Sequence, residues 1–208
     1  MHGVMPTTLL VAGGPATSLG TTIPNRATRA NGIADDGTIV GWQDAENGQR
    51  EAVKWVNGVQ EYILTNNGLT NGEAMAVNGP GTAIVGTNYG YGIVQSGWIW
   101  QQGKGTTAIV EGPFRVIPTA VSDDGRTAVG NVIVTSGGDR RAFVWTEGKG
   151  VTYLDDLLKS KGGSLAAGWQ IQSLNAMSAD GQIIGGWGIN PNGEIEGFLV
   201  DLKETGKP

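Results

Sequence analysis

The stretch Val121-Ser-Asp-Asp-Gly-Arg-Thr-Ala-Val-Gly130 is one of four versions of the same short sequence in this chain. The other copies begin at Ile33 (IADDGTIVG), Val77 (VNGPGTAIVG) and Met177 (MSADGQIIGG), so successive copies are 44, 44 and 56 residues apart. In each copy a glycine turn separates two runs rich in small and β-branched residues. Because glycine adopts the positive φ that a tight turn requires, the repeated stretch predicts a β-hairpin.

A second pattern has the same period. The markers VKW, WIW, FVW and FLV end at Trp55, Trp100, Trp145 and Val200, which are 45, 45 and 55 residues apart. Both patterns therefore place about eleven extra residues in the last interval, between Trp145 and Met177. The third unit shows four strand-like runs, PTAVS, RTAVGNVIV, RAFVW and VTYL, separated by turn residues. Four short strands in a unit of 40–45 residues are typical of a β-propeller blade.

These repeats predict an all-β fold, a four-bladed β-propeller of four-stranded antiparallel blades in a single domain, 1–208. The blades are expected at about 30–73, 74–118, 119–174 (with an insertion at 154–170) and 175–203. The fourth unit stops after its third strand, while TTLLVA near the N-terminus resembles the fourth-strand runs of other units. We therefore expect a strand at 7–12 to complete the fourth blade and close the ring, which would remove the exposed end blades. An open β-solenoid and two chains that share strands remain as alternatives.

The unit resembles the HAF-repeat family of extracellular bacterial proteins. The first half of its motif is read at Ala30-Asn-Gly-Ile-Ala-Asp-Asp-Gly-Thr-Ile-Val-Gly41, and its Ala-Phe-aliphatic-Trp marker is complete at Ala142–Trp145. The resemblance covers nearly all of the chain from about Ala30, and it implies a β-propeller that is secreted or lies at the cell surface. The histidine that names the family is replaced in all four units, by Glu51, Ser96, Arg141 and Glu196. Chemistry that depends on that histidine is thus not expected here.

The composition excludes several classes of function. The formal net charge is −5 and no basic run is longer than Arg140-Arg141, so nucleic-acid binding is not expected. No apolar run is long enough to span a membrane, and the first fourteen residues lack the pattern of a signal peptide. With no cysteine and only His2, the chain has neither a thiolate zinc site nor a Ser-His-Asp or Cys-His arrangement. The acids of the Asp-Gly turns are expected to bind turn amides rather than calcium, so we expect no metal and no cofactor.

The aromatic residues divide into two groups. Trp55, Trp100 and Trp145 share one position in successive units and are expected in the core between blades. Trp42 and Trp187 follow the glycine that ends the second strand, where the chain is expected to enter a variable loop, and such loops commonly carry function. The predicted ligand-binding residues are Trp42, Tyr89, Tyr91, Asn131, Trp169 and Trp187. The alternative is that these rings cap the blades. The insertion predicts one helical turn at 155–159, which either forms a lid or packs its leucines against a blade.

The function expected from these features is an extracellular or cell-surface binding module. Aromatic rings beside asparagine side chains suit the flat faces and hydroxyl groups of sugars, so the expected partner is a glycan or a surface protein. A polysaccharide-active lyase or hydrolase with a Tyr/Arg/carboxylate site is the first alternative, although no spacing selects a catalytic pair. A structural repeat or protein-interaction module is the second alternative, which a flat hydrophobic face and self-association would favour.

Overall fold

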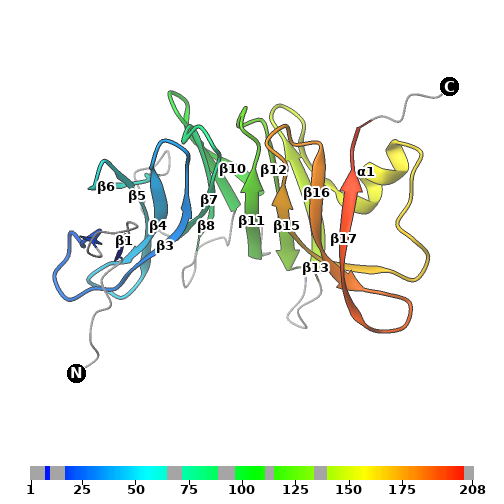
Figure 1. Cartoon of the computed structure of the whole chain (residues 1–208), viewed down its shortest axis with the longest axis horizontal. Coiled ribbons are helices and arrows are strands. Elements are labelled where there is room, and N and C mark those ends of the chain that lie inside the picture. The colour runs from blue at the N-terminus through cyan, green and yellow to red at the C-terminus, as the bar shows by residue number, and fades with distance from the viewer. Residues whose placement is uncertain are drawn as a thin grey trace.

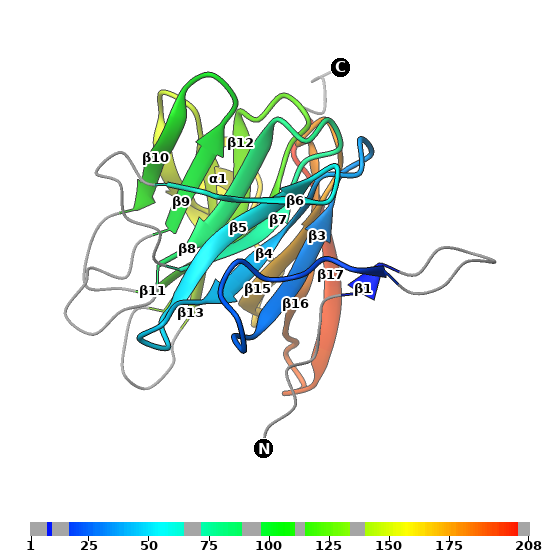
Figure 2. The ribbon, with the colours of Figure 1, turned by 90° about the vertical axis from the view of Figure 1, so that its left-hand side faces the viewer.

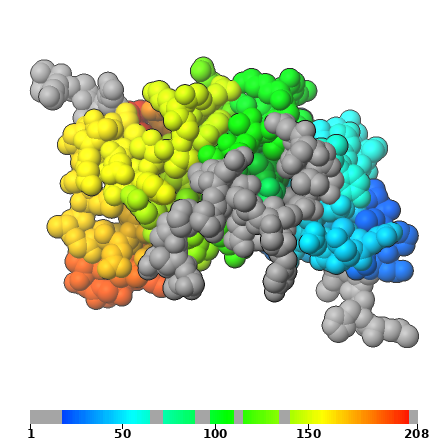
Figure 3. All heavy atoms as spheres, turned by 180° about the vertical axis from the view of Figure 1, so that it is seen from behind, coloured from blue at the N-terminus to red at the C-terminus, as the bar shows by residue number. Residues whose placement is uncertain are grey.

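The computed structural model describes residues 8–9, 17–64, 72–88, 97–110, 115–133 and 140–203. Within this part of the chain, four antiparallel β-sheets follow one another in sequence and stand side by side in an open row (Figure 1). From behind, the first sheet lies at one end of the row and the fourth at the other (Figure 3). The expected all-β architecture of four repeating sheets is confirmed.

Each of the first three sheets has four strands in chain order, as the repeat predicts. The first contains β3 (Thr28–Ile33), β4 (Ile39–Asp44), β5 (Arg50–Val56) and β6 (Val59–Tyr62). The second contains β7 (Glu73–Val77), β8 (Ala83–Thr87), β9 (Gly97–Gln101) and β10 (Gly105–Val110). The third contains β11 (Arg115–Val121), β12 (Thr127–Ile133), β13 (Arg140–Thr146) and β14 (Gly150–Tyr153). The fourth contains only β15 (Gln170–Met177), β16 (Ile183–Ile189) and β17 (Ile195–Asp201).

The repeated Asp-Gly stretch forms the hairpin between the first two strands of each sheet. Its glycine has a positive φ in all four copies, for example 83° at Gly37 and 67° at Gly125. The acid before that glycine accepts a backbone hydrogen bond across the turn, at 2.8 Å from Thr38 N–H to Asp36 and at 2.9 Å from Arg126 N–H to Asp124. The turn chemistry predicted from the sequence is thus confirmed.

The glycine after the second apolar run has another role than the sequence suggested. It does not end the strand, because β4 continues to Asp44 and β16 to Ile189. A Cβ atom on Gly41 would lie 1.8 Å from the carbonyl oxygen of Arg29, and one on Gly186 would lie 1.8 Å from that of Ser173. The first strand of each sheet has a register shift near this point, and its backbone crosses too closely for any side chain.

The sheets pack face to face along the row. We call the face of a sheet that packs on the following sheet its forward face, and the opposite face its rear face. On the forward faces, apolar residues of the second and third strands are buried against residues of the following sheet in three separate apolar clusters: Val40 and Ala52 in the first sheet, Val85 and Ile99 in the second, and Val129 and Val144 in the third. Trp55, Trp100 and Trp145 occupy equivalent places on the rear faces, opposite Ile39, Ile84 and Ala128. Trp55 and Trp145 are buried and Trp100 is half-buried, as expected for core positions.

Polar contacts between neighbouring sheets also repeat. The N–H of Asp35 donates to the carbonyl oxygen of Gly79 at 2.8 Å, and the equivalent N–H of Asp123 donates to that of Ala179 at 2.8 Å. At the register shift of the first strand, Asn31 donates to the carbonyl of the next sheet's first strand at 2.8 Å, and Thr119 does so at 2.7 Å. The position of each sheet is therefore fixed both by apolar burial and by backbone groups that would otherwise lack partners.

The insertion forms α1 (Leu154–Ser160), which includes the predicted helical turn, and Gly162 follows it with a φ of 77°. Leu154 is buried, and Leu157 and Leu158 pack on the cluster that joins the third and fourth sheets. From behind, the yellow surface of this region adjoins the orange and red fourth sheet (Figure 3). The insertion thus packs its leucines on the sheets, the second of the two expectations for it.

The N-terminal segment differs from the prediction. Within the predicted strand 7–12, Thr8–Leu9 form β1, which pairs with β2 (Thr17–Ser18) and not with β17; the remaining residues of that strand lie outside the described part. The sheets form an open row, so the closed four-bladed ring is not confirmed. The partner of β1 follows it closely in the sequence, whereas pairing with β17 would require β1 to reach the far end of the row.

Candidate functional site

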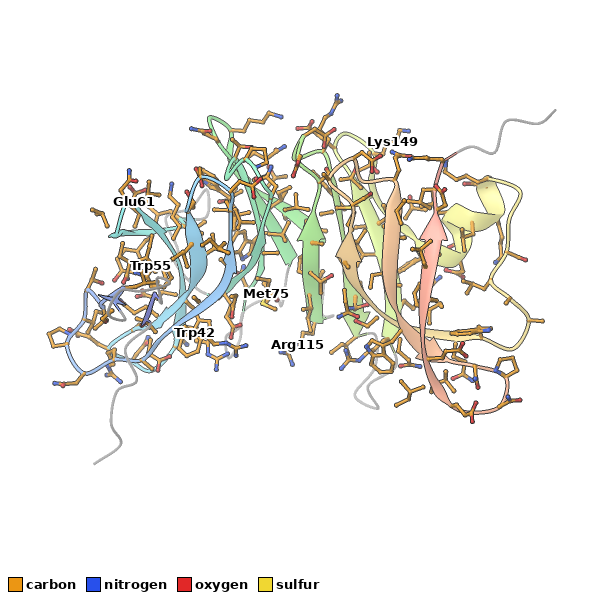
Figure 4. The ribbon with its side chains drawn as sticks, in the orientation of Figure 1. Trp42, Trp55, Glu61, Met75, Arg115 and Lys149 are labelled. Carbon is orange, nitrogen blue, oxygen red and sulfur yellow. The ribbon has the colours of Figure 1, made fainter. Side chains whose placement is uncertain are left out.

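Two of the predicted ligand-binding residues lie inside the packed row rather than in loops. Trp42 belongs to β4 and is 8% exposed, with the guanidinium of Arg50 4.2 Å from its ring centre. Asn131 belongs to β12 and is 2% exposed; its amide donates to Ser173 Oγ at 2.9 Å and accepts from Leu174 N–H at 2.9 Å. Figure 4 shows Trp42 within the first sheet. The loop positions expected for both residues are corrected, because the strands continue beyond the repeated glycine.

The other predicted residues are not gathered on one surface. Trp187 is half-buried in β16 and, by register, belongs to the forward face of the fourth sheet, opposite Gly197. Trp169 is half-buried before β15, and its ring meets that of Phe198 edge-on, with 6.4 Å between ring centres. Phe198 belongs to the rear side of the same sheet, in the cluster with the third sheet. Tyr89 and Tyr91 lie outside the described residues.

Several charged side chains that could serve in a Tyr/Arg/carboxylate site have structural partners. Arg141 stacks on Tyr153 with 3.6 Å to the ring centre, and it donates to Asp155 at 3.0 Å. Burial raises the pKa of Asp155, but the hydrogen bond and charge of Arg141 outweigh it and leave that pKa below its ordinary value. Arg140 is exposed at the start of β13, while Glu194 and Glu196 both accept from Asn190. Arg141, Tyr153 and Asp155 thus lie together where β14 meets α1, whereas Glu194 and Glu196 gather around Asn190.

The acids of the repeated turns act as caps. The Ser122 hydroxyl beside Asp124 and the Ser178 hydroxyl beside Asp180 hold the pKa of each carboxyl below its ordinary value. In the described part of the chain, no group of three or more His, Asp or Glu side chains is arranged to hold a metal ion. Nor does that part contain a helix long and apolar enough to cross a membrane.

The forward face of the fourth sheet is the surface that the sequence did not single out. Register aligns Gly185 and Leu199 with Val129 and Val144, which are buried under the fourth sheet. No further sheet follows the fourth one within the described residues. Leu199 is therefore 69% exposed, and Ile195 is 76% exposed. Along the same face, β16 and β17 present Ile183, Gly185, Trp187, Ile189, Ile195, Gly197, Leu199 and Asp201.

This face was missed for a physical reason. A periodic pattern of buried residues predicts that a face exists, but whether a following sheet covers it is a property of the whole row. One signal was present in the sequence: the fourth copy reads IIGG where the others read TIVG, AIVG and TAVG. Gly185 therefore replaces a valine that is completely buried in the other three sheets.

No family model matches this chain, and neither does any curated protein. The crystal structure of TolB from Acinetobacter baumannii is similar, with a TM-score of 0.54 and 14% identity over 91% of this chain and 44% of that one. The putative TolB from Agrobacterium tumefaciens has a TM-score of 0.53 and 14% identity over 92% of this chain and 64% of that one. Both neighbours are β-propeller proteins.

The fold is of the β-propeller type. At 14% identity this likeness extends to the fold alone, and the chain spans less than two thirds of the length of either TolB structure. In the β-propeller row, the fourth sheet is a blade with one uncovered face, and the resemblance to HAF-repeat proteins stays a prediction.

Proposed function

We propose that this protein is a structural interaction module, and that two copies associate through the forward faces of their fourth sheets. The observation that carries the proposal is the exposure of Leu199, because its equivalents Ile99 and Val144 in the second and third sheets are buried. Of the side chains on this face in β16 and β17, only Asp201 is charged. A contiguous apolar surface with so little charge is characteristic of a protein contact.

The other end of the row supports a second copy with two-fold symmetry. The rear face of the first sheet is occupied, because Leu19 packs on Ile39, Val53 and Trp55. A head-to-tail contact between copies would have to displace that segment. A contact of the fourth sheet with the same sheet of another copy displaces nothing, and a surface that contacts itself generates a closed dimer.

The shape of the face suits such a contact. Built Cβ atoms on Gly185 and Gly197 would meet nothing nearer than 3.5 and 3.7 Å, so these glycines leave a shallow floor beside Leu199. A leucine from the partner copy would fill that floor. Three strands of seven or eight residues cover roughly 23 by 14 Å. This is well below the roughly 800 Å² per partner of a standard interface, so we expect a weak, concentration-dependent dimer.

Sedimentation velocity over a concentration series tests the proposal. We expect the weight-average sedimentation coefficient of the wild type to rise with concentration. Leu199→Glu should weaken the association at least about ten-fold, because two-fold symmetry places the new carboxylates of both copies in one apolar contact. Val59→Glu is the matched control, since Val59 is 63% exposed in the first sheet at the far end of the row. A wild type that stays monomeric throughout, or a Leu199→Glu protein that associates normally, contradicts the proposal.

Carbohydrate binding is a second candidate, favoured by the half-exposed ring of Trp187 beside the glycine floor. A sugar ring would stack on the indole and lie over the glycines. Titration with neutral and acidic oligosaccharides, followed by tryptophan fluorescence, tests this candidate. A saturable change that is lost in Trp187→Ala supports it, whereas a flat response across the panel removes it.

A further inference from the structure

We propose that the outer edge of β17 accepts an extended polypeptide segment of another protein as a fourth, antiparallel strand. The proposal concerns the edge of the fourth sheet and not its forward face, so it goes beyond the self-association proposed above. It starts from the strand count: three sheets have four strands, and the fourth ends at β17 in the described part of the chain. The expected fourth strand of this sheet, residues 7–12, is represented there only by β1, which pairs with β2.

The outer edges of the sheets differ in how they are protected. Unpaired edges attract additional strands, and proteins protect them by shortening or bulging the edge strand or by placing proline or charged residues, lysine above all, in it. In the first and third sheets the outer strands β6 and β14 have four residues each, and in the second sheet β10 has a register shift. The outer strand β17 has seven residues, pairs with β16 without a register shift, and contains neither proline nor lysine.

The inner edges are protected as well. The first strands β3, β7, β11 and β15 all have register shifts. Among the edge strands of the four sheets in the row, β17 therefore stands out as long and regular, with Glu196 and Asp201 as its only charged residues. At the outer end of the row, its backbone is displayed beside the open face (Figure 1). Strand addition at such an edge is a general mode of peptide recognition.

The repeat indicates what the added strand should contain. Val200, Leu199 and Phe198 are equivalent to Trp145, Val144 and Phe143, which pair with Val151, Thr152 and Tyr153 of β14. In the first sheet, Tyr62 is likewise paired with the residue equivalent to Phe198, which is Val53. The sequence that fits is a short β-branched run that places an aromatic ring beside Phe198, where a cross-strand pair is stabilising.

Charge then distinguishes the fourth sheet from the third. Arg141 in β13 binds Asp155, which follows β14 in the chain. The residue equivalent to Arg141 in β17 is Glu196, so the local charge is inverted. A segment for the fourth sheet should therefore carry lysine or arginine two residues after its aromatic residue, where the third sheet has Asp155. The expected occupant is an extended segment of the form Val-Thr-Tyr-Leu-Lys.

The experiment uses the full chain and two synthetic peptides, GVTYLK and GVTYLD, the second of which copies residues 150–155. Binding is measured by fluorescence anisotropy, and pairing is located by amide hydrogen exchange. We expect exchange at β17 to slow about ten-fold when GVTYLK is present at about ten times its Kd. Because an exposed ion pair adds little, GVTYLK should bind only about three-fold more tightly than GVTYLD.

Charge reversal gives the matched variant. Glu196 is exposed, and Glu196→Arg should reverse the preference, so that GVTYLD binds more tightly than GVTYLK. Peptides with N-methyl groups on one alternate set of amides should lose binding, and those methylated on the other set should retain it.

Any one of three results overturns the proposal. These are unchanged hydrogen exchange at β17, equal binding of a scrambled peptide, and a peptide preference that Glu196→Arg does not change. The two proposals are tested separately, because Leu199→Glu changes only the forward face and leaves the β17 backbone able to pair.

Discussion

The two ends of the row present the same kind of surface to different surroundings. At the first sheet, the rear face carries Ile39, Val53 and Trp55, and the N-terminal segment covers them through Leu19. Figure 2 shows this dark blue segment crossing the first sheet. At the fourth sheet, the forward face leaves Leu199 69% exposed. A repeat protein needs a distinct solution at each end because its terminal units lack one neighbour.

Polar contacts hold the cover of the first sheet in place. Gln43 is fully buried; its amide oxygen accepts from Thr22 N–H at 2.9 Å and from Thr21 Oγ1 at 2.8 Å, and its amide nitrogen donates to Tyr62 at 2.9 Å. At the fourth sheet the equivalent position is Gly188, which has no side chain to hold a cover. The cover is incomplete even at the first sheet, where Ile33 is 62% exposed. The comparison teaches that one end of the row is covered by the chain itself, whereas the other presents an exposed apolar face.

The largest expected effect separates the two ends directly. Trp55→Ala removes a ring that is 1% exposed (Figure 4), and we expect it to lower the free energy of unfolding by about 3–5 kcal/mol. Leu199→Ala at the open end should change it by less than about 0.5 kcal/mol. Urea unfolding followed by circular dichroism measures both. Similar costs at the two ends would show that the fourth sheet's face is covered in solution.

The second prediction concerns the hydrogen bonds of Gln43 that hold the N-terminal segment on the first sheet. Gln43→Ala leaves Thr21, Thr22 and Tyr62 without their common partner, and we expect a loss of about 1–3 kcal/mol in the free energy of unfolding. The variant should show faster amide hydrogen exchange at residues 21–23, with a smaller change in the exchange rate of β12. Gln182→Ala, an exposed glutamine at the open end, is the control and should be nearly neutral. Unchanged exchange at residues 21–23 would mean that Leu19 alone holds the segment.

A third prediction makes the open end resemble the interior. Gly185→Val restores the valine of the other three sheets, and a Cβ there meets only ordinary contacts. We expect a gain of about 0.5–1 kcal/mol in the free energy of unfolding, because glycine loses more conformational freedom on folding. Its neighbour gives the control: Gly186→Ala should destabilise the protein, since its Cβ would overlap the backbone of Ser173. Thermal unfolding measures the change in stability of both variants. If both variants were stabilised, or both destabilised, the assignment of Gly185 to the open face would be wrong.

The smallest expected effect is a pH dependence at the open end. The Ser178 hydroxyl and the Gln182 N–H lower the pKa of Asp180, so its contribution to stability is present above the ordinary pKa of an aspartate. That contribution is lost as the pH falls through the lowered pKa of the folded protein. Asp180→Asn should therefore lose slightly less stability than the wild type between pH 5 and pH 3. Unfolding midpoints at the two pH values measure the difference, and a larger loss in the variant would contradict it.

The sequence predicted the features that depend on local chemistry. The Asp-Gly hairpins, the four-strand unit, the equivalent positions of Trp55 and Trp145 and the helical turn after Leu154 are all present. Each follows from a turn glycine, an alternation of apolar residues or a leucine pair, which act over a few residues.

The sequence misled where distance along the row matters. The glycine at Gly41 or Gly186 reads as the end of a strand, but only the approach of another strand explains it. This error placed Trp42 and Asn131 in loops when both are buried between sheets. The closure of the ring was also inferred from the likeness of two strands, whereas β1 finds a partner close to it in the chain. The uncovered face of the fourth sheet could not be predicted from local patterns either, because its exposure depends on whether another sheet packs on it.

The turn of the fourth sheet gives the row a direction of growth. The N–H of Ala179 is equivalent to the donors of Asp35 and Asp123, and it has no acceptor among the described residues. An extra copy of the third repeat, grafted by design after Lys203, would meet an N–H group that has no acceptor among the described residues, and an exposed apolar face. A copy grafted before Thr28 would first have to displace Leu19 from its contact with Trp55. We therefore expect an added repeat to pack more readily on the fourth sheet than on the first, where it would compete with Leu19.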